Sequence, residues 1–408
     1  MEYREVAPLK QRLDLTLALP GSKSITNRAL LCAALAKGES RLFGALESQD
    51  TAVMRQALKA FQKKGKITVD LANAGTATRF LTAMACLRKW PTVITGSKRM
   101  QERPIADLVD ALRQLGAKIT YKGRRGCPPL EIVSPIPLIH QKEYVVRMKG
   151  DVSSQYFSAL LMLGPMLQRP LRIRVIGKLV SRPYVDMTLA VMKAFGVRVT
   201  NKGYREFLVK LQAYKACDYA IEGDASAASY FYSLQYLHGG RLKFENLGPR
   251  SIQGDADYPK ALARLGKGSI NMNAMPDSAM TLAVTAPFAH GQTEITNVGN
   301  LRVKETDRLQ ALSAELARVG VRNKTTKDSI VIFPQTFLRS SSNPPQSIRT
   351  YSDHRMAMCF AVLGTQVPGV VIQDPDCVDK TYPHFWRDLE LAYLSPISLG
   401  RKNLVLTG

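Results

Sequence analysis

Short runs rich in Lys, Arg, Ser and Gly recur along the chain, and several stand directly before an apolar stretch. The run LPGSKSITNRALL places Lys23, Ser24 and Arg28 where a strand is expected to meet a helix. Unpaired backbone N–H groups and the helix dipole favour anions at such a helix start. The run is not a P-loop, because Ser22 occupies the position of the Gly before the Lys. It predicts a site for an anionic group, although a solvated helix cap is the alternative.

Two further runs repeat this device. NAGTATR contains Gly75, which lets a backbone approach a ligand closely. RMQERP contains Arg99 and Arg103 just before Pro104, a good first-turn residue for the helix that follows. Guanidinium groups bind carboxylate and phosphate oxygens in pairs. Both runs therefore point to anionic ligands, unless the arginines simply face solvent.

Neutral donors form a third group. The run DVSSQYF supplies Ser153, Ser154 and Gln155, and SRPYVD supplies Ser181 and Tyr184. Such side chains hold phosphate oxygens or hydroxyls without adding charge. Helix capping explains the serines equally well.

Carboxylates accompany the cations at two places. Asp277 in PDSAM heads an almost wholly apolar helix, and beside a bound substrate it is suited to general-base catalysis. The run NLRVKETDRLQAL is the most charged short run, and it contains Lys304, Glu305 and Arg308. Lys304 and Arg308 share one helix face if that turn is helical. A solvated helix start is the alternative reading.

The last group lies near the C-terminal end. SDHRMAM places Asp353, His354 and Arg355 at another helix start, and DKTYP contains Lys380. No GxSxG nucleophile elbow accompanies the histidine, so hydrolytic acyl chemistry has no support. Taken together, these helix starts suit a substrate pair rich in phosphate and carboxylate.

The elements that position these residues form a repeat. A tight polar turn opening an Ala-, Leu- or Met-rich helix recurs six times, and its anchors are spaced 54, 76, 73, 53 and 76 residues apart. An amphipathic helix that ends at Gly and leads into a strand follows in most units, as in ALRQLGAKIT. Each unit reads as strand, helix, strand, helix and closing strands, so we expect an α/β protein of two similar domains with a boundary near residues 218–224. The anchors are Gly21, Gly75, Asp151, Asp224, Asp277 and Asp353.

Composition agrees with two domains. At 408 residues the chain exceeds the size at which one core stops growing. The first fifteen residues mix both charge signs, and no apolar stretch reaches the ~18 residues of a membrane span, so we expect a cytoplasmic protein without a membrane anchor. The six cysteines are scattered without metal-ligand spacing, so no metal is expected. Cys32, Cys86 and Cys359 lie in apolar runs and are predicted core residues.

The formal net charge of +24 is extreme. Excess Lys and Arg are typical of proteins that bind nucleic acid, an anionic surface or anionic small substrates. The basic residues are spread along the chain, with no basic tail and no aromatic-interleaved RNA-binding motif. We therefore do not expect a nucleic-acid partner, and a non-catalytic basic protein that binds nucleic acid stays as an alternative.

Ten runs, in this order, resemble the motifs of one enzyme family, the EPSP synthases (3-phosphoshikimate 1-carboxyvinyltransferases). They extend from residue 20 to residue 383. The runs are PGSKSITNRAL, NAGTATR, RMQERP, VSSQY, SRPYVD, EGDASAASYF, PDSAM, RVKETDRL, DHRMAM and DKTYP.

The resemblance implies a two-domain, inside-out α/β barrel of the enolpyruvyl transferase type, with three βαβαββ-type repeats per domain. One domain would comprise residues 1–20 and 222–408, the other residues 21–221, and the active site would lie in the cleft between them. The resemblance implies no cofactor, and we expect a monomer whose domains close on the first substrate.

The reaction implied is transfer of the enolpyruvyl group of phosphoenolpyruvate to the 5-hydroxyl of shikimate 3-phosphate, by addition and then elimination of phosphate, on the shikimate pathway to chorismate and the aromatic amino acids. Lys23, Asp277 and Glu305 would be catalytic, with Asp277 taking the hydroxyl proton and Glu305 protonating the enol carbon. By the same resemblance, shikimate 3-phosphate would contact Lys23, Ser24, Arg28, Ser153, Ser154, Gln155, Ser181, Tyr184, Asp277, Asn300 and Lys304. Phosphoenolpyruvate would contact Lys23, Gly75, Arg99, Gln155, Arg308, Arg355 and Lys380.

Some residues depart from the family pattern. Ala72 stands where the family often has Gly, and Thr78 and Phe80 stand where it often has Met and Pro. These positions flank the expected phosphoenolpyruvate pocket, so they bear on tolerance to the inhibitor glyphosate, in a direction that the sequence does not give.

The nearest rival is the sister family that transfers enolpyruvate to UDP-N-acetylglucosamine. Its loop cysteine should precede the arginine of an RP motif, whereas here RMQE precedes Arg103, and Cys127 lies more than twenty residues beyond. Lys23 is also followed by Ser24 where the sister family has Asn. Both differences favour the EPSP synthase reading.

Overall fold

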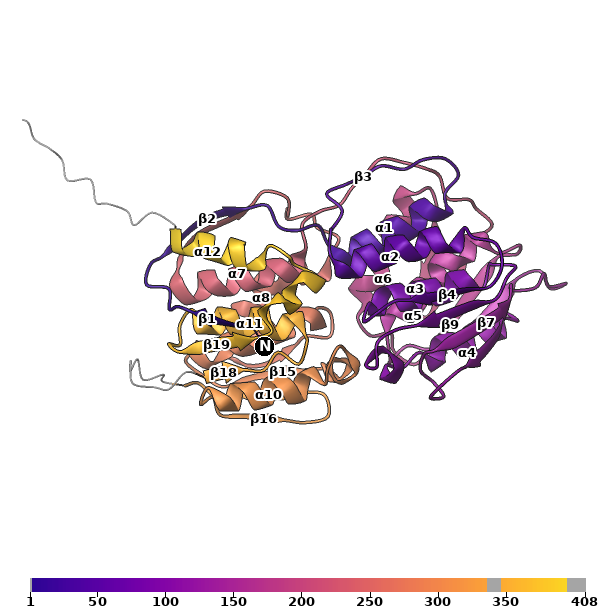
Figure 1. The fold of residues 1–408 in the computed structure, drawn as a ribbon. Coiled ribbons are helices and arrows are strands. Elements are labelled where there is room, and N and C mark those ends of the chain that lie inside the picture. Colours follow the sequence, from indigo (N-terminus) through magenta and orange to yellow (C-terminus); the bar gives the residue numbers. More distant parts are fainter. Residues whose placement is uncertain (1, 336–345, 395–408) are drawn as a thin grey trace, which may run out of the picture.

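The chain folds into two lobes of alternating helices and strands. The computed structural model describes residues 2–335 and 346–394. Figure 1 shows one lobe built from the indigo-to-magenta part of the chain, and a second lobe built from the pink-to-yellow part together with the N-terminal strands. Within the described residues, no helix is both long and apolar enough to cross a membrane.

Three four-stranded sheets in the described part of the chain share one topology. In each, the first two strands are parallel, a helix connects them, and the fourth strand pairs antiparallel with both the second and the third. Along the chain, the elements of each sheet follow the order strand, helix, strand, helix, strand, strand. The sheets contain β4 (Ile67–Asp70), β5 (Thr92–Thr95), β6 (Lys118–Tyr121) and β7 (Leu130–Ser134); β8 (Tyr144–Lys149), β9 (Leu171–Ile176), β10 (Val199–Lys202) and β11 (Glu206–Val209); and β14 (Gly268–Asn271), β15 (Thr293–Thr296), β16 (Asn323–Thr325) and β17 (Ile330–Ile332).

The remaining strands form smaller sheets and link the chain ends to the second lobe. The first strand pairs antiparallel with the last one, and the second pairs in parallel with a strand more than 220 residues later. The N-terminal segment therefore belongs to the same layers as the C-terminal one. The small sheets are β1 (Tyr3–Val6) with β19 (Val370–Gln373) and β18 (Gln346–Ile348), β3 (Leu42–Phe43) with β12 (Tyr219–Ala220), and β2 (Leu13–Leu17) with β13 (Gly240–Phe244).

The helices that follow the tight polar turns lie in the interior of each lobe. Their Ala-, Leu- and Met-rich sequences leave little surface for solvent, and all eleven residues of α11 are buried. In the first lobe α3 packs on α5, and in the second α11 packs on α9. These helices are α1 (Lys23–Leu35), α3 (Gly75–Ala85) and α5 (Ser154–Leu163), and α7 (Ala225–His238), α9 (Ala279–Thr285) and α11 (His354–Gly364).

The amphipathic helices end as the pattern predicts. Gly65, Gly116, Gly196, Gly266 and Gly320 follow five of them with positive φ, between 74° and 92°, which is the conformation that favours glycine at a helix end. The helices are α2 (Gln49–Phe61), α4 (Ala106–Gln114), α6 (Arg182–Ala194), α8 (Tyr258–Leu262) and α10 (Arg308–Arg318), with α12 (Phe385–Leu394) near the C-terminal end. Short 3₁₀ turns are η1 (Met100–Glu102), η2 (Gly164–Met166), η3 (Gly254–Asp257), η4 (Pro276–Ser278), η5 (Ala286–Phe288), η6 (Gly299–Val303) and η7 (Pro375–Lys380).

Each lobe has its own hydrophobic core. One cluster of buried residues runs from Ile25 to Ile221, and the other joins residues 6–19 to residues 227–392. We call the bodies around these clusters the first lobe and the second lobe. Cys32, Cys86 and Cys359 are fully buried in the cores, which confirms their predicted role.

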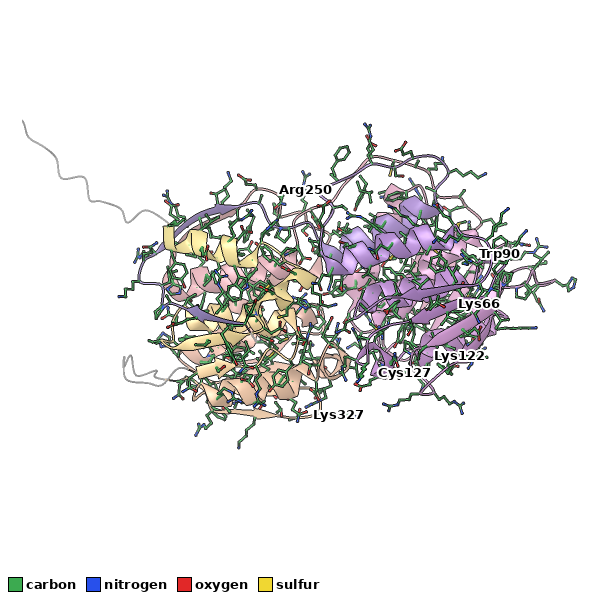
Figure 2. The ribbon with its side chains drawn as sticks, in the orientation of Figure 1. Lys66, Trp90, Lys122, Cys127, Arg250 and Lys327 are labelled. Carbon is green, nitrogen blue, oxygen red and sulfur yellow. The ribbon has the colours of Figure 1, made fainter. Side chains whose placement is uncertain are left out.

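Charge is divided very unevenly between the lobes. Residues 21–221 contain 34 Lys and Arg against 13 Asp and Glu, a formal net charge of +21, whereas the remaining residues contain 23 against 20 and carry +3. Lys66 and Lys122 lie on the outer side of the first lobe (Figure 2), where their ammonium groups are 2.6 and 3.3 Å from the carboxylate of Glu131. The excess charge of the chain is thus a property of the first lobe.

Candidate active site

A pocket lies where the two lobes meet. It offers about 900 Å³ of space, its open mouth included, and its lining contains six cationic side chains and three carboxylates. The lining residues are Lys23, Ser24, Asp50, Gly75, Thr76, Arg79, Arg103, Pro104, Val152, Ser153, Ser154, Gln155, Tyr156, Ser181, Tyr184, Pro276, Asp277, Asn300, Val303, Lys304, Glu305, Arg308 and Arg355.

Helix starts from both lobes converge on this pocket. The lining includes residues in the first turn of α1, α3, α5, α10 and α11, the N-cap of α6, and the 3₁₀ turn that precedes α9. Each helix start brings unpaired N–H groups and the positive end of the helix dipole. Side chains already cap some of these N–H groups. Ser153 accepts a hydrogen bond from the backbone amide of Gln155, and Asp353 accepts one from the backbone amide of Arg355. The arrangement favours anionic ligands, as the sequence predicts.

Asp277 is the acidic centre of the pocket. Its carboxylate lies 3.4 Å from each of three cationic groups, on Lys304, Arg308 and Arg355, and 3.5 Å from the Tyr184 hydroxyl. Burial favours the neutral acid, but the three positive charges outweigh it and hold the pKa of Asp277 well below its usual range. The side chain is therefore ionised at neutral pH.

Glu305 is a second carboxylate of the pocket, half-buried on the loop before α10. Its oxygens lie 2.9 Å from Arg308 and 3.9 Å from Arg103. Burial raises its pKa, while the charges of Arg308, Arg103 and Lys380 lower it more, so the net pKa is well below the usual range. Arg308 is fixed in turn by Asp353, which accepts hydrogen bonds of 2.7 and 3.0 Å from it.

Lys304 and Arg308 do not share a helix face, because residues 304–307 are not helical and α10 begins at Arg308. The loop nevertheless brings both cations to the same oxygen of Asp277. Lys304 is half-buried, and loss of solvent lowers its pKa, while the Asp277 charge acts in the opposite direction. The two cations therefore meet through tertiary structure and not through local periodicity.

Neutral donors from the first lobe also line the pocket. Ser153, Ser154 and Gln155 stand at the start of α5, and the side-chain amide of Gln155 donates a 3.3 Å hydrogen bond to the Thr76 hydroxyl. Asn300 is also in the lining, and within the described part of the chain its side-chain oxygen has no hydrogen-bond partner. A buried amide oxygen of this kind suits a ligand hydroxyl.

Three predicted ligands are not part of the lining. Arg28 is buried behind it and donates to Thr188 and Ser158 and to the carbonyls of Ser24 and Tyr184. Its guanidinium also lies 5.3 Å from the centre of the Phe80 ring. Burial lowers the pKa of Arg28 to about 10. This side chain holds α1, α5 and α6 together.

Arg99 and Lys380 lie at the edge of the pocket and bridge the lobes. Arg99 donates to the carbonyls of Lys304 and Glu305 at 3.1 to 3.2 Å. Lys380 donates to Asp50 at 2.5 Å and to the Asn73 carbonyl at 2.9 Å. Both cations therefore engage protein oxygens from the other lobe.

Sequence reasoning missed Asp50 and Arg79, which both line the pocket. Asp50 lies between Lys23, at 3.6 Å, and Lys380, and only the fold brings these residues together. Arg79 stands one turn after Gly75 in the run NAGTATR, so that spacing was a usable signal. His354 is fully buried, and burial followed by the charge of Lys23 lowers its pKa well below the usual range, so the ring is neutral.

The structure shows the surroundings of the three residues that depart from the family pattern. Ala72 adopts φ 46°, a left-handed conformation that glycine tolerates better than alanine. Thr78 is buried and donates to the Ala74 carbonyl at 2.9 Å. Phe80 is buried beneath Arg28. None of the three is in the lining of the pocket.

Comparison with known proteins gives a consistent result. The family model described as EPSP synthase (3-phosphoshikimate 1-carboxyvinyltransferase) matches residues 9–268 and 262–389. A protein of Sulfurovum sp. (strain NBC37-1) named 3-phosphoshikimate 1-carboxyvinyltransferase is 42% identical, over 91% of this chain and 95% of its own length. One of the same name from Vibrio vulnificus (strain YJ016) is 40% identical over 98% and 100%.

A solved structure of EPSP synthase from Acinetobacter baumannii shares the fold, with a TM-score of 0.76 over 96% of this chain and 98% of that one, at 22% identity. The likeness in sequence extends through every run that lines the pocket, from Lys23 to Arg355. The chain belongs to the EPSP synthase family, the 3-phosphoshikimate 1-carboxyvinyltransferases.

Proposed function

We propose that this chain transfers the enolpyruvyl group of phosphoenolpyruvate to the 5-hydroxyl of shikimate 3-phosphate and releases inorganic phosphate. The observation that carries the proposal is the convergence of six cations and seven helix starts on one pocket between the lobes. The two substrates each carry a phosphate and a carboxylate, so four anionic groups need partners there. Three carboxylates in the lining leave a cationic excess for them.

We propose the same domain division as the sequence suggests, with residues 21–221 in one domain and residues 1–20 and 222–408 in the other. Support comes from the two separate hydrophobic clusters. The finer description, an inside-out α/β barrel with three βαβαββ-type repeats per domain, is supported by the shared topology of the three four-stranded sheets and by the packing of helices inside each lobe.

For shikimate 3-phosphate we propose the wall that carries the neutral donors. The phosphate would lie against the starts of α5 and α6, where hydroxyl and N–H donors cluster. The ring hydroxyls would reach Asp277, Asn300 and Lys304. The proposed contacts are Lys23, Ser24, Ser153, Ser154, Gln155, Ser181, Tyr184, Asp277, Asn300 and Lys304, with Arg28 acting from behind through Ser24 and Tyr184.

For phosphoenolpyruvate we propose the cationic side of the pocket. Lys23, Gln155, Arg308 and Arg355 are in the lining, and Gly75 leaves room for close approach to the backbone. Arg99 and Lys380 join the site if they exchange their present carbonyl and carboxylate partners for substrate oxygens. For Lys380 the partner given up is Asp50, which also lies beside Lys23.

The proton transfers that we propose use two carboxylates of the pocket, Asp277 and Glu305. Asp277 accepts the proton of the 5-hydroxyl while the 5-oxygen of shikimate 3-phosphate attacks C2 of phosphoenolpyruvate. Glu305 delivers a proton to C3. In the second step the C3 proton returns to a carboxylate, phosphate leaves with the C–O bonding pair, and the double bond forms again. Lys23 stabilises the charge on the departing phosphate.

The low pKa of both carboxylates sets a condition on this chemistry. Ionised Glu305 cannot donate a proton, and strongly stabilised Asp277 is a weak base. Substrate anions that bind Arg308, Arg355 and Lys304 offset these positive charges, and so raise the pKa of each carboxylate. Bound substrates therefore prepare the acid and the base, and the free enzyme keeps both carboxylates ionised.

The direct test measures phosphate release from phosphoenolpyruvate with each of two acceptors, shikimate 3-phosphate and UDP-N-acetylglucosamine. We expect release with the first only. Release with the second only would assign the chain to the sister activity. Release with neither, together with salt-sensitive binding of a nucleic acid, would favour the non-catalytic alternative.

Three further expectations belong to this proposal. The cytoplasmic location and the monomeric state stay predictions, the latter open to light scattering on the purified chain. Closure of the lobes on shikimate 3-phosphate also stays a prediction, and small-angle scattering with and without the substrate tests it. An unchanged radius of gyration would count against closure.

A further inference from the structure

The start of α6 is the point where the first lobe meets two residues of the second lobe that are outside the pocket lining. Ser181, the N-cap of α6, adopts φ 51° and ψ 46°, a left-handed conformation that is uncommon for a residue other than glycine. Its amide donates to the side-chain oxygen of Asn273 at 2.9 Å, and its hydroxyl donates to the Asn273 carbonyl at 3.1 Å. Both bonds cross from one lobe to the other.

One turn later the pattern repeats. The Tyr184 hydroxyl donates to Asp255 of the second lobe at 3.1 Å, which is closer than its 3.5 Å approach to Asp277. Ser226 and Ser278 donate to the other oxygen of Asp255, at 3.0 and 2.6 Å. These three bonds fix the carboxylate in one orientation.

The environment of Asp255 supports this picture. The side chain is buried, and among the described residues no cation pairs with it. Burial and then the neighbouring Asp277 charge raise the pKa of Asp255 to about 6. Its hydrogen bonds from hydroxyl groups therefore replace an ion pair.

Between these two contacts the lobes touch closely. A Cβ added at Gly254 would lie 2.5 Å from the Cβ of Pro183, which stands between Ser181 and Tyr184 in α6. Real side chains do not approach so closely, so the surfaces of the two lobes match only because residue 254 is glycine.

We infer that Asn273 and Asp255 are positioning residues, which set Ser181 and Tyr184 for the substrate only when the two lobes are in contact. The inference rests on the proposed function, because Ser181 and Tyr184 are proposed ligands of shikimate 3-phosphate. Asn273 and Asp255 touch no reacting atom. When the lobes separate, Ser181 loses both hydrogen bonds that hold its left-handed conformation, and Tyr184 loses the acceptor that directs its hydroxyl. Contact between the lobes thus completes this wall of the pocket.

The first experiment compares Asn273→Ala with Asn201→Ala. Asn201 is a matched control, because its side-chain oxygen accepts a 2.8 Å hydrogen bond from the Tyr204 amide within one lobe, away from the pocket. We expect Asn273→Ala to raise the KM for shikimate 3-phosphate about two- to tenfold, the range for one hydrogen bond. The KM for phosphoenolpyruvate at saturating shikimate 3-phosphate and kcat should stay close to wild type. Asn201→Ala should leave all three constants unchanged.

A double-mutant cycle with Ser181→Ala separates positioning from general stability. The Asn273 side chain holds the Ser181 amide. If this bond serves to position the Ser181 hydroxyl, Asn273→Ala should raise the KM for shikimate 3-phosphate much less in the Ser181→Ala background. Equal effects in both backgrounds would overturn the inference for Asn273. The same comparison for Asp255→Asn uses Tyr184→Phe, with Asp257→Asn as its control, since Asp257 is exposed and pairs with Lys260.

A steric variant tests the contact itself. Gly254→Ala should hold the lobes apart and raise the KM for shikimate 3-phosphate by about tenfold. Gly248→Ala is the control, because no atom lies within 4 Å of a Cβ at that position. Equal kinetics in the two variants would contradict the inference. A wild-type protein that releases no phosphate refutes the proposed function and the inference with it, whereas an active wild type with unchanged variants refutes only the inference.

Discussion

The substitution Asp277→Asn removes one negative charge from the centre of the pocket and keeps the size of the side chain. The proposed mechanism gives this carboxylate two roles, since it accepts the proton of the 5-hydroxyl and it balances three cations. An amide can still hydrogen-bond a substrate hydroxyl, but it cannot take up the proton. The substitution therefore separates catalysis from binding.

The structure sets the size of both effects. Each of the three cationic groups lies 3.4 Å from the carboxylate, and at an effective dielectric constant of about 20 each such contact contributes about 5 kcal/mol of Coulomb energy. Without the carboxylate these cations attract substrate anions more strongly, so the Kd for shikimate 3-phosphate should stay equal or fall. Loss of a general base lowers kcat by about 10²- to 10⁴-fold.

Two measurements on the Asp277→Asn protein show whether the carboxylate serves catalysis or binding. Titration calorimetry gives the Kd for shikimate 3-phosphate, and rapid-quench phosphate release at saturating substrates gives the rate of the chemical step. Asp257→Asn, on the surface of the same lobe, controls for the change of a carboxylate to an amide. A kcat close to wild type would refute the base role of Asp277. A large rise in Kd would show that the carboxylate serves binding instead.

Three other predictions concern stability and charge. Ala72→Gly should raise the free energy of unfolding by about 0.5 to 1 kcal/mol in urea titrations, because it relieves the left-handed alanine, whereas Ala74→Gly, at φ −80°, should lower it. The pKa of Asp255 is raised to about 6, so between about pH 4 and 6 the folded chain keeps a proton that the unfolded chain releases. The free energy of unfolding of the wild type should therefore fall by up to about 3 kcal/mol relative to that of Asp255→Asn as the pH rises through 6. A difference that does not vary with pH would contradict this. Because residues 21–221 carry +21, kcat/KM for both anionic substrates should fall as salt rises while kcat holds constant, and a salt-independent kcat/KM would exclude electrostatic steering.

Much of the framework could be predicted from local sequence. Three of the polar turns cap their helices directly, because Ser153, Asp224 and Asp353 accept hydrogen bonds from first-turn amides. The glycines that end the amphipathic helices adopt the positive φ that their position requires. Both signals act over a few residues. They were therefore enough to predict where many of the helices begin and end, and to place several of the pocket's cations at helix starts.

The rest depends on contacts between distant segments. The sequence around Asp50 does not predict its contact with Lys380, 330 residues later. The sequence around Ser181 does not predict its contact with Asn273. Arg28 stands in the same run as Lys23, yet one turn of helix directs it behind the pocket towards Thr188. Local sequence gives the residue type and the helix start, whereas packing between helices decides which side chains reach the pocket.

Phosphorus NMR of the reaction mixture can show whether the pocket between the lobes joins these two substrates. With phosphoenolpyruvate and shikimate 3-phosphate present, we expect the phosphoenolpyruvate signal to be replaced by an equal amount of inorganic phosphate. The phosphate on the shikimate ring should remain attached, in a product that carries an enol ether at the 5-oxygen. Loss of the ring phosphate, or no change in either signal, would contradict the proposed enolpyruvyl transfer.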